Sequence, residues 1–478
     1  MTEREGTVRA SGAASAPLVP QPQRGGAVAG WVWRLESPAG LTTLFVLALL
    51  LRLLLAPHGG FYGDLGFFHD WARRLGARGF SSFYNQGSDY LYPPGYLYVL
   101  WLIGKISASP GYVLLKLPAI LGDLALAWLA GAFAVALAPR DVRERCPVRA
   151  LVAAAVLFNP AVITLSAIWG QMDVLPATLV LGSLFVLLTR RPSFSRDVVA
   201  CLLFGVAVAT KPQVAFALPV VLYALSRGRD HRDLRNAVRG TLKVFVPLTA
   251  GLLLWFASAL PFGLSPVELA RFYRDSASLY PVTSANAFNL WALGGFWRPD
   301  VPGAARSDPL TVADVSALHV GMLLLVIAAA VTLWRMHRQI SRGGNEASIL
   351  LATAATLGLL WFALSTRMHE RYIFYSLVLL APLVVVRRLA GVFSVLSTVC
   401  LLNLWWVLAD FNPPGSACRL PRFACLGADM MFGGTINAWQ QKLWATVVTG
   451  LALSLAWLGP GWAAALDREP ARLAVSDG

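Results

Sequence analysis

Long apolar runs recur from Leu41 to the end of this 478-residue chain and restrict it to very few folds. Hydrophobic residues make up 57% of the chain and charged residues only 14%, whereas soluble proteins carry about 25% charged residues. A helix needs about 20 apolar residues to cross a bilayer. Twelve runs approach that length, and they begin near residues 41, 112, 150, 174, 197, 214, 244, 317, 347, 372, 389 and 441. We therefore predict an all-α, polytopic integral membrane protein with about 12 transmembrane helices.

Basic residues determine the predicted orientation of these helices. The chain has 40 Lys and Arg against 25 Asp and Glu, a net charge of +15. The cations lie in short loops between apolar runs, and no basic helix carries interleaved aromatics, so we expect no nucleic-acid partner. An N-terminus on the inside places 24 of the 40 in short cytoplasmic segments, as the positive-inside rule requires. The membrane domain is then expected over 41–466, between cytoplasmic tails at 1–40 and 467–478.

The same topology gives three long extracytoplasmic loops, over 57–111, 261–316 and 408–440. An apolar stripe along residues 65–75 predicts an amphipathic helix that lies on the outer membrane surface. A second such helix is expected after Pro93 and Pro94, because its Tyr and Trp side chains suit the headgroup zone. The first outer loop should therefore carry two juxtamembrane helices.

Five cysteines occur along the chain without CxxC or Cys/His spacing, so no structural zinc is expected. We also predict no cofactor. Cys418 and Cys425 share the third outer loop, where an oxidising periplasm would permit a disulfide between them. Arg greatly outnumbers Lys and Ala is abundant, as in GC-rich bacterial genomes. We expect a bacterial inner (cell) membrane, with the outer loops on the periplasmic or extracellular face.

Ionisable side chains gather at the outer ends of the predicted helices, where charges are costly and are usually paired or functional. Some of them also have plain structural interpretations. Asp64 could be the N-cap of the 65–75 helix, since Asp is a preferred N-cap residue. Asp70 on that helix could be a solvated surface charge, and a single His369 is more often structural than functional.

Further along the chain the same two interpretations compete. Lys116, Lys211 and Arg371 could extend their charged ends to the membrane interface. Gln171 and Asp173 could join neighbouring helices by hydrogen bonds. The functional interpretation gains weight because the predicted topology brings all these side chains to one face of the membrane.

One carboxylate among several cations suits a particular class of reaction. A carboxylate base can deprotonate an acceptor hydroxyl while positive charge stabilises a departing phosphate. Inverting transfer of a sugar from a lipid-phosphate carrier requires both. Hydrolysis of a glycosidic bond would instead require two carboxylates. This pattern therefore favours sugar transfer.

Seven short motifs occur in an order that can be compared with a known family. They are Asp64-Leu-Gly-Phe-Phe-His-Asp-Trp71, Tyr92-Pro-Pro-Gly-Tyr96, Lys116-Leu-Pro-Ala-Ile-Leu-Gly-Asp123, Asn159-Pro160 with Gly170-Gln171-Met-Asp173, Lys211-Pro-Gln213, Arg271-Phe-Tyr-Arg274 with Ala287-Phe-Asn-Leu-Trp291, and His369-Glu370-Arg371. Over residues 60 to 385 the chain resembles the dolichyl-phosphate-glucose-dependent glucosyltransferases of N-glycan assembly. It also resembles their bacterial polyprenyl-phosphate-sugar-dependent relatives, within the C-type glycosyltransferase superfold. Asp173 replaces the family's Asn, and Arg371 replaces its Lys.

The resemblance implies a role for each of these residues. Asp64 is the expected general base, and no essential metal is implied. Residues expected to bind the donor phosphate or sugar are Gln171, Asp173, Lys211, Gln213, Arg271, Arg274, His369, Glu370 and Arg371. Acceptor-binding or structural candidates on the outer face are Asp70, Tyr92, Lys116, Asp123 and Trp291. The expected partners are a polyprenyl-phosphate-linked hexose or pentose, a lipid-linked or surface glycan acceptor, and membrane lipids.

Two other classes of membrane protein fit a basic chain with many helices. A transporter or a flippase of lipid-linked saccharides would also bury ionisable groups. However, transporters usually have repeated halves and place their binding sites at the membrane midplane, whereas the two halves of this chain share no motif. A non-catalytic membrane partner would leave the shared position of the candidate charges unexplained.

Overall fold

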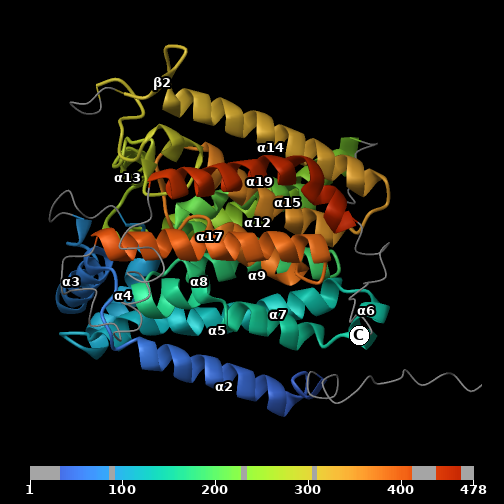
Figure 1. The fold of residues 1–478 in the computed structure, drawn as a ribbon, viewed down its shortest axis with the longest axis horizontal. Coiled ribbons are helices and arrows are strands. Elements are labelled where there is room, and N and C mark those ends of the chain that lie inside the picture. The colour runs from blue at the N-terminus through green and yellow to red at the C-terminus, as the bar shows by residue number, and fades with distance from the viewer. Residues whose placement is uncertain (1–32, 85–91, 228–233, 304–308, 412–437, 465–478) are drawn as a thin grey trace, which may run out of the picture.

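Long helices lie side by side along the longest axis of the molecule (Figure 1). The computed structural model describes residues 33–84, 92–227, 234–303, 309–411 and 438–464. Up to residue 257 its elements are α2 (Pro38–Leu55), α3 (Tyr62–Arg78), α4 (Pro94–Ile106), α5 (Tyr112–Leu137), α6 (Arg140–Arg145), α7 (Val148–Leu157), α8 (Pro160–Ile163), the π-helix η2 (Thr164–Trp169), α9 (Val174–Thr189), α10 (Phe194–Thr210), the 3₁₀-helix η3 (Pro212–Ala217), α11 (Leu218–Ser226) and α12 (Leu234–Ala257).

The second half of the chain adds more helices and four two-residue strands. Its elements are η4 (Leu260–Phe262), α13 (Pro266–Ala277), β1 (Ser284–Ala285), η5 (Leu290–Gly294), β2 (Thr311–Val312), β3 (Val315–Ser316), α14 (Ala317–Ser341), α15 (Glu346–Leu364), β4 (Met368–His369), α16 (Phe374–Leu380), η6 (Ala381–Leu383), α17 (Arg387–Phe411) and α19 (Ala438–Ala464). Strand β1 pairs in parallel with β4, and β2 pairs antiparallel with β3.

Within the described ranges, seven helices are long and apolar enough to cross a membrane. They are α2, α5, the helical stretch Gly240–Phe262, α14, α15, α17 and α19. Residues Val148–Leu157 and Pro160–Trp169 form one more candidate, bent by 47° at its break. The prediction of a helical, multi-pass membrane protein is confirmed, whereas the count of twelve spans is not.

Four of the predicted spans form shorter helices. The runs near residues 174, 197, 214 and 372 became α9, α10, η3 with α11, and α16 with η6. Helices α9 and α10 have 16 and 17 residues, or about 24–26 Å at 1.5 Å per residue, against about 30 Å for the hydrocarbon core. All of α16 is buried inside the protein. Hydropathy alone therefore does not separate these four runs from membrane spans, because a helix covered by other helices is as apolar as one covered by lipid.

The two helices predicted in the first outer loop are present as α3 and α4, and their position on the membrane surface stays a prediction. The stripe of Phe68, Trp71 and Leu75 on α3 is buried against α4. The helices approach closely because Gly76 faces Gly104, where a Cβ atom on Gly76 would lie 2.5 Å from the carbonyl oxygen of Gly104. Figure 1 shows α3, α4 and α13 together at one end of the bundle, so parts of the first two predicted outer loops meet there.

The other predicted boundaries fall partly outside the described residues. The first helix begins at Pro38 instead of Leu41, with Ser37 as its N-cap. Helix α17 ends at Phe411, so most of the third predicted loop, with Cys418 and Cys425, lies outside the described residues. The two predicted tails also lie outside the described residues, apart from residues 33–40. The disulfide and the domain boundaries stay predictions.

A buried ion pair joins the first two long helices. The Arg52 Nε on α2 lies 2.7 Å from Asp123 Oδ2 on α5, and both side chains are fully buried. Arg52 also donates to the carbonyl oxygen of Leu157 at the end of α7, and the Ser166 hydroxyl of η2 donates to Asp123. Asp123, a sequence candidate for acceptor binding or structure, therefore contacts framework residues that hold α2, α5, α7 and η2 together.

We expect that Arg52→Leu or Asp123→Leu alone destabilises the protein by about 3–5 kcal/mol, because each leaves an uncompensated buried charge. The double variant should recover much of this loss. Thermal unfolding in detergent would measure it, with Arg140→Leu as the control, since the Arg140–Glu144 pair is largely exposed. Equal losses in all three single variants would contradict the interpretation.

Candidate active site

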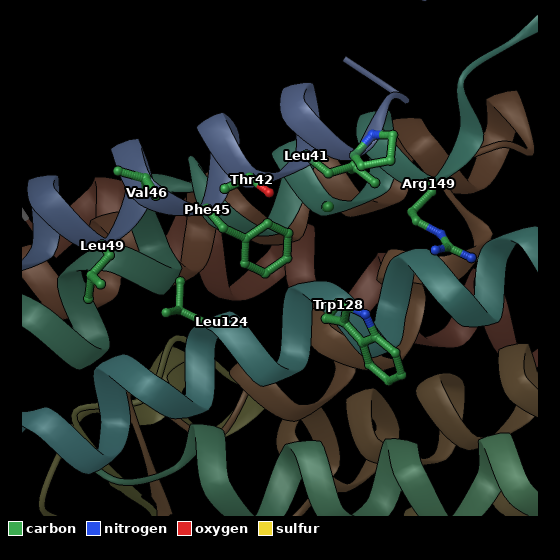
Figure 2. Close-up of a pocket in the computed structure, with 10 residues that line it drawn as sticks. Leu41, Thr42, Phe45, Val46, Leu49, Leu124, Trp128 and Arg149 are labelled. Carbon is green, nitrogen blue, oxygen red and sulfur yellow. The ribbon is translucent and has the colours of Figure 1, made fainter. Parts of the chain in front are cut away.

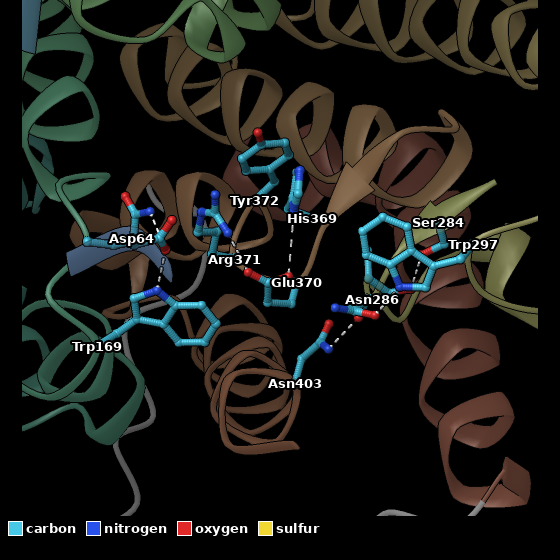
Figure 3. A network of polar contacts seen from close by, with 12 residues as sticks. Asp64, Trp169, Ser284, Asn286, Trp297, His369, Glu370, Arg371, Tyr372 and Asn403 are labelled. Carbon is cyan, nitrogen blue, oxygen red and sulfur yellow. Dashed lines mark hydrogen bonds and ion pairs between the residues drawn. The ribbon is translucent and has the colours of Figure 1, made fainter. Parts of the chain in front are cut away.

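Asp64 points from α3 toward the segment that follows the bent helix. Helix α3 begins at Tyr62, so Asp64 lies inside the first turn and the N-cap interpretation is wrong. Its Oδ2 accepts hydrogen bonds of 2.7 Å from the indole N–H of Trp169 and of 2.7 Å from the amide of Gln171 (Figure 3). Both donors are fully buried. The carboxylate is thus held in one orientation by two donors, which is how preorganised catalytic groups are built.

A glycine turn brings both donors to Asp64. The π-helix η2 ends at Gly170, whose φ of 91° lies in the left-handed region that favours glycine. A Cβ atom there would also meet the side chain of Leu65 at 2.6 Å. Single π-turns are frequent at functional sites. The backbone conformation at Gly170 therefore allows Trp169 and Gln171, on either side of it, to donate to one carboxylate.

Lys116 holds the segment before α3 against the π-helix. Its Nζ donates to the carbonyl oxygens of His58 at 2.8 Å, Gly59 at 3.2 Å and Ala167 at 3.0 Å. The side chain is fully buried, so the idea that it extends to the membrane interface is wrong. As one of the acceptor-binding or structural candidates, Lys116 has contacts that fit the structural role.

Asp173 is the centre of a second buried group. Its Oδ1 accepts from the Lys211 ammonium at 2.6 Å and from the Tyr375 hydroxyl at 2.6 Å. Asp173 and Lys211 are both almost completely buried. Lys211 therefore does not extend to the membrane interface. Asp173 joins neighbouring helices by hydrogen bonds, as one of its two interpretations predicted. The two side chains connect the start of α9 to the end of α10 and to α16.

The His369-Glu370-Arg371 turn adds a third group of charges. The Arg371 Nη1 lies 2.6 Å from Glu370 Oε1, and its Nε lies 3.7 Å from Asp173 Oδ2. His369 Nδ1 lies 3.8 Å from the other Glu370 oxygen. Arg371 is only 11% exposed, so it does not extend to the membrane interface either.

These charges influence one another strongly. Burial alone would raise the pKa of Glu370, but the Arg371 guanidinium and His369 outweigh it and lower that pKa to about 2. Burial likewise opposes the charge on Arg371, yet the carboxylates of Asp64 and Glu370 hold its pKa well above the usual value. The pKa of Arg371 therefore depends on the carboxylate of Asp64 as well as on its ion-pair partner Glu370.

A small parallel sheet fixes this turn. Strands β1 and β4 pair Ser284 with Met368 and Ala285 with His369, and Asn286 forms a further bridge to His369. The backbone of Asn286 in turn accepts a hydrogen bond from Asn403 on α17 (Figure 3). This anchors the second predicted outer loop against the turn.

An ion pair holds the start of the same turn. Arg367, with a left-handed φ of 66°, binds Asp300 with an Nε–Oδ2 distance of 2.7 Å. It also donates to the carbonyl oxygen of Ala277 at the end of α13. The chain is thereby held on both sides of His369.

Four buried polar atoms in this region have no hydrogen-bond partner within the described residues. They are Tyr92 Oη, Asp173 Oδ2, Gln213 Oε1 and Arg371 Nε. Leaving such an atom unpaired costs about 1–3 kcal/mol. The charges of Asp173, Arg371 and Asp64 all act on the Tyr92 hydroxyl. The Gln213 amide donates to the hydroxyl of Tyr372, the residue that follows Arg371. Two of the four atoms, on Asp173 and Arg371, belong to the charged group itself and lie 3.7 Å apart. Polar atoms without hydrogen-bond partners are expected where a polar ligand binds.

Several sequence candidates lie elsewhere. Arg271 and Arg274 are exposed on α13, and Arg274 pairs with Asp275. Asp70 pairs with arginines on its own helix and is partly exposed, which agrees with a surface charge. The Trp291 indole donates to the carbonyl oxygen of Leu364, a structural contact.

Sequence reasoning missed the roles of Trp169 and Tyr375. Both are buried, and each donates to one of the two central aspartates. A buried indole N–H or phenol O–H usually has a partner, but nothing in the spacing of the sequence names that partner. The expectation of one carboxylate among several cations also changes, because Asp173 and Glu370 accompany Asp64.

Comparison with known proteins identifies the family. The sequence model of glycosyltransferase family 87 matches residues 90–366, which is more than half of the chain. The chain belongs to glycosyltransferase family 87. The predicted glycosyltransferase resemblance is thus confirmed, and the family 87 chain is an enzyme rather than a transporter. The match begins after Asp64 and ends before His369, so the assignment of those two residues rests on the structure and the motifs.

Two solved structures are weakly similar to the family 87 chain. ArnT from Cupriavidus metallidurans, solved bound to undecaprenyl phosphate, is 17% identical, with 90% of this chain and 78% of ArnT covered and a TM-score of 0.48. The Archaeoglobus fulgidus oligosaccharyltransferase is 14% identical, with 91% of this chain and 58% of that chain covered and a TM-score of 0.38. No curated protein matches the sequence.

We expect that Trp169→Phe lowers sugar transfer by about 10- to 100-fold, because a hydrogen bond to a charged group contributes about 1.5–3 kcal/mol. Phe keeps an aromatic ring against Phe61, on which Trp169 stacks. Steady-state transfer assays would measure the loss. Trp291→Phe, which also removes a buried indole donor, is the control, and an equal loss in both variants would contradict a specific role for Trp169.

Proposed function

We propose that this enzyme transfers a hexose or a pentose from a polyprenyl-phosphate-linked donor to a lipid-linked or surface glycan acceptor, with inversion at the sugar carbon. Asp64 is the general base, and Arg371 with His369 holds the donor phosphate. Lys211 and Asp173 keep Arg371 in place, and Gln213 and Tyr92 offer polar atoms to the sugar or the phosphate. The observation that carries the proposal is that Asp64 lies near enough to the buried Arg371 to raise its pKa, while the Arg371 Nε has no hydrogen-bond partner among the described residues.

The reaction follows from this geometry. The Asp64 carboxylate removes the proton from the acceptor hydroxyl, whose oxygen forms a bond to the anomeric carbon. The bond from that carbon to the phosphate oxygen breaks, and the electron pair leaves with the polyprenyl phosphate. The fixed charge on Arg371 stabilises the negative charge that develops there, without the reorganisation that water would need.

Asp64 and Arg371 have different binding partners, which keeps the base from forming an ion pair with the cation. Asp64 receives two neutral donors, Trp169 and Gln171, while Arg371 has Glu370 as its direct ion-pair partner. A direct Asp64–Arg371 ion pair would occupy the base. The neutral donors orient Asp64 and leave its carboxylate free of a direct ion pair among the described residues, so that it can accept the proton of an acceptor hydroxyl. The absence of a metal from this reaction remains a prediction.

We further propose that the site faces the periplasm or the extracellular space of a bacterial cell membrane, in a chain that crosses the membrane about twelve times. The distribution of Lys and Arg supports this orientation. Helix α2 runs from the predicted cytoplasmic tail toward α3, which carries Asp64.

We expect Asp64→Asn to insert normally, to bind the donor and to lose transfer by roughly 10²-fold or more, because general-base action contributes ~10²–10⁴-fold. Asn still accepts the hydrogen bonds from Trp169 and Gln171, so the fold should survive. Asp70→Asn is the matched control on the same helix and should keep most activity. Wild-type transfer by Asp64→Asn would show that the base has been misassigned.

Arg371→Gln and His369→Ala should weaken donor binding by about tenfold each, since each removes a side chain proposed to donate a hydrogen bond to the charged phosphate. Equilibrium binding of a fluorescent polyprenyl-phosphate sugar would measure the change, with thermal unfolding as a check on folding. The exposed Arg274→Gln should have a smaller effect. If Arg274→Gln alone weakened binding, the phosphate would bind on α13 instead.

The orientation can be tested with impermeant thiol reagents in intact cells. In a cysteine-free background, Asp230→Cys should be protected, because residues 227–243 are predicted to be cytoplasmic. Ala305→Cys, in the second predicted outer loop, should react. The opposite labelling pattern would place Asp64 in the cytoplasm and overturn the proposed acceptor compartment.

A further inference from the structure

A groove between α2, α5 and α7 lies at the other end of α2 from the Asp64 site (Figure 2). Its cavity volume is about 450 Å³. The lining residues are Pro38, Leu41, Thr42, Phe45, Val46, Leu49, Leu124, Trp128, Arg149 and Ala153. All but Thr42 and Arg149 are apolar. No step of the proposed reaction uses this groove.

The groove opens toward the surrounding hydrocarbon. Helix α2 is poorly covered by the rest of the protein, with only 17% of its apolar window buried. Val46 and Trp128, on two sides of the groove, are about half exposed. The lining residues on α2 extend from Pro38 to Leu49, a length of about 16 Å at 1.5 Å per residue. One leaflet contributes about 15 Å of hydrocarbon, so the groove has the length of one acyl chain.

A single cation lies at the polar end of this groove. Arg149, in the first turn of α7, faces the groove beside Trp128 (Figure 2). Its stem packs on Gly131 of α5, where a Cβ atom would lie 3.1 Å from the Arg149 Cγ. Its Nε is buried and has no hydrogen-bond partner among the described residues, nor does Arg149 form an ion pair with any of them. Glu36 instead accepts from the backbone N–H of Ala150.

We propose that this groove binds one anionic glycerophospholipid from the leaflet opposite the Asp64 site. One acyl chain lies along α2, and the phosphate binds the Arg149 guanidinium. A buried donor without a partner is costly, and a phosphate oxygen is a strong acceptor for it. The apolar wall of one-leaflet length selects a lipid tail over a soluble anion. The lipid also fills the gap between three helices that support the active-site end.

The test is native mass spectrometry of the full-length protein titrated with phosphatidylglycerol or phosphatidylcholine. Wild type should bind one phosphatidylglycerol at least about tenfold more tightly than phosphatidylcholine, and Arg149→Gln should lower that affinity by about tenfold. Arg145→Gln, which removes an exposed cation near the same end, should leave it unchanged. Equal affinity for the two lipids, or no effect of Arg149→Gln, would overturn the proposal.

A second variant keeps the test decisive if Arg149→Gln does not fold. Ala153→Phe adds volume to the groove wall without changing any charge, and it should reduce phosphatidylglycerol binding while Arg149 remains. Retained wild-type affinity in Ala153→Phe would place the lipid elsewhere. Asp64→Asn should bind phosphatidylglycerol like wild type, so failure of the lipid site and failure of the proposed reaction give different results.

Discussion

A guanidinium buried in an apolar bundle is stable only among carboxylates, and the active-site end of this enzyme is arranged around that requirement at Arg371. Glu370 binds the guanidinium directly, Asp173 lies beyond hydrogen-bond distance on its other side, and Asp64 contributes to its electrostatic environment. The acids and bases come from α3, the turn before α9, the end of α10 and the turn before α16. Charge compensation therefore brings together segments that are distant in the sequence. It leaves the Arg371 Nε without a hydrogen-bond partner in the part of the chain that the structure describes.

Two other buried cations hold the framework without touching the proposed substrate. Lys116 binds three backbone carbonyl oxygens around the π-helix, and Arg52 joins α2, α5 and α7 through Asp123 and Leu157. Arg149 differs from both because it has no such partner among the described residues. The rule that buried charges require partners explains the contacts of Lys116 and Arg52. The same rule, applied to the buried Nε of Arg149, supports the proposed lipid site.

Sequence alone predicted the helical membrane class and the two helices α3 and α4, because apolar runs and apolar stripes are local signals. The site residues that it named stay predictions. The predicted count of twelve spans is not confirmed, since α16 is covered by protein and is as apolar as a membrane helix. It considered Asp64 as an N-cap because the start of α3 cannot be placed to within two residues. It did not predict that Trp169 and Tyr375 donate to Asp64 and Asp173, because those contacts depend on tertiary packing.

The central claim is that base and phosphate-binding cation belong to one site. A cryo-electron microscopy structure of the enzyme with a bound polyprenyl-phosphate sugar tests it most directly. The account predicts that a phosphate oxygen lies within hydrogen-bond distance of the Arg371 Nε, with the anomeric carbon between the phosphate and Asp64. A phosphate bound at the exposed arginines of α13, with the sugar remote from Asp64, would contradict it.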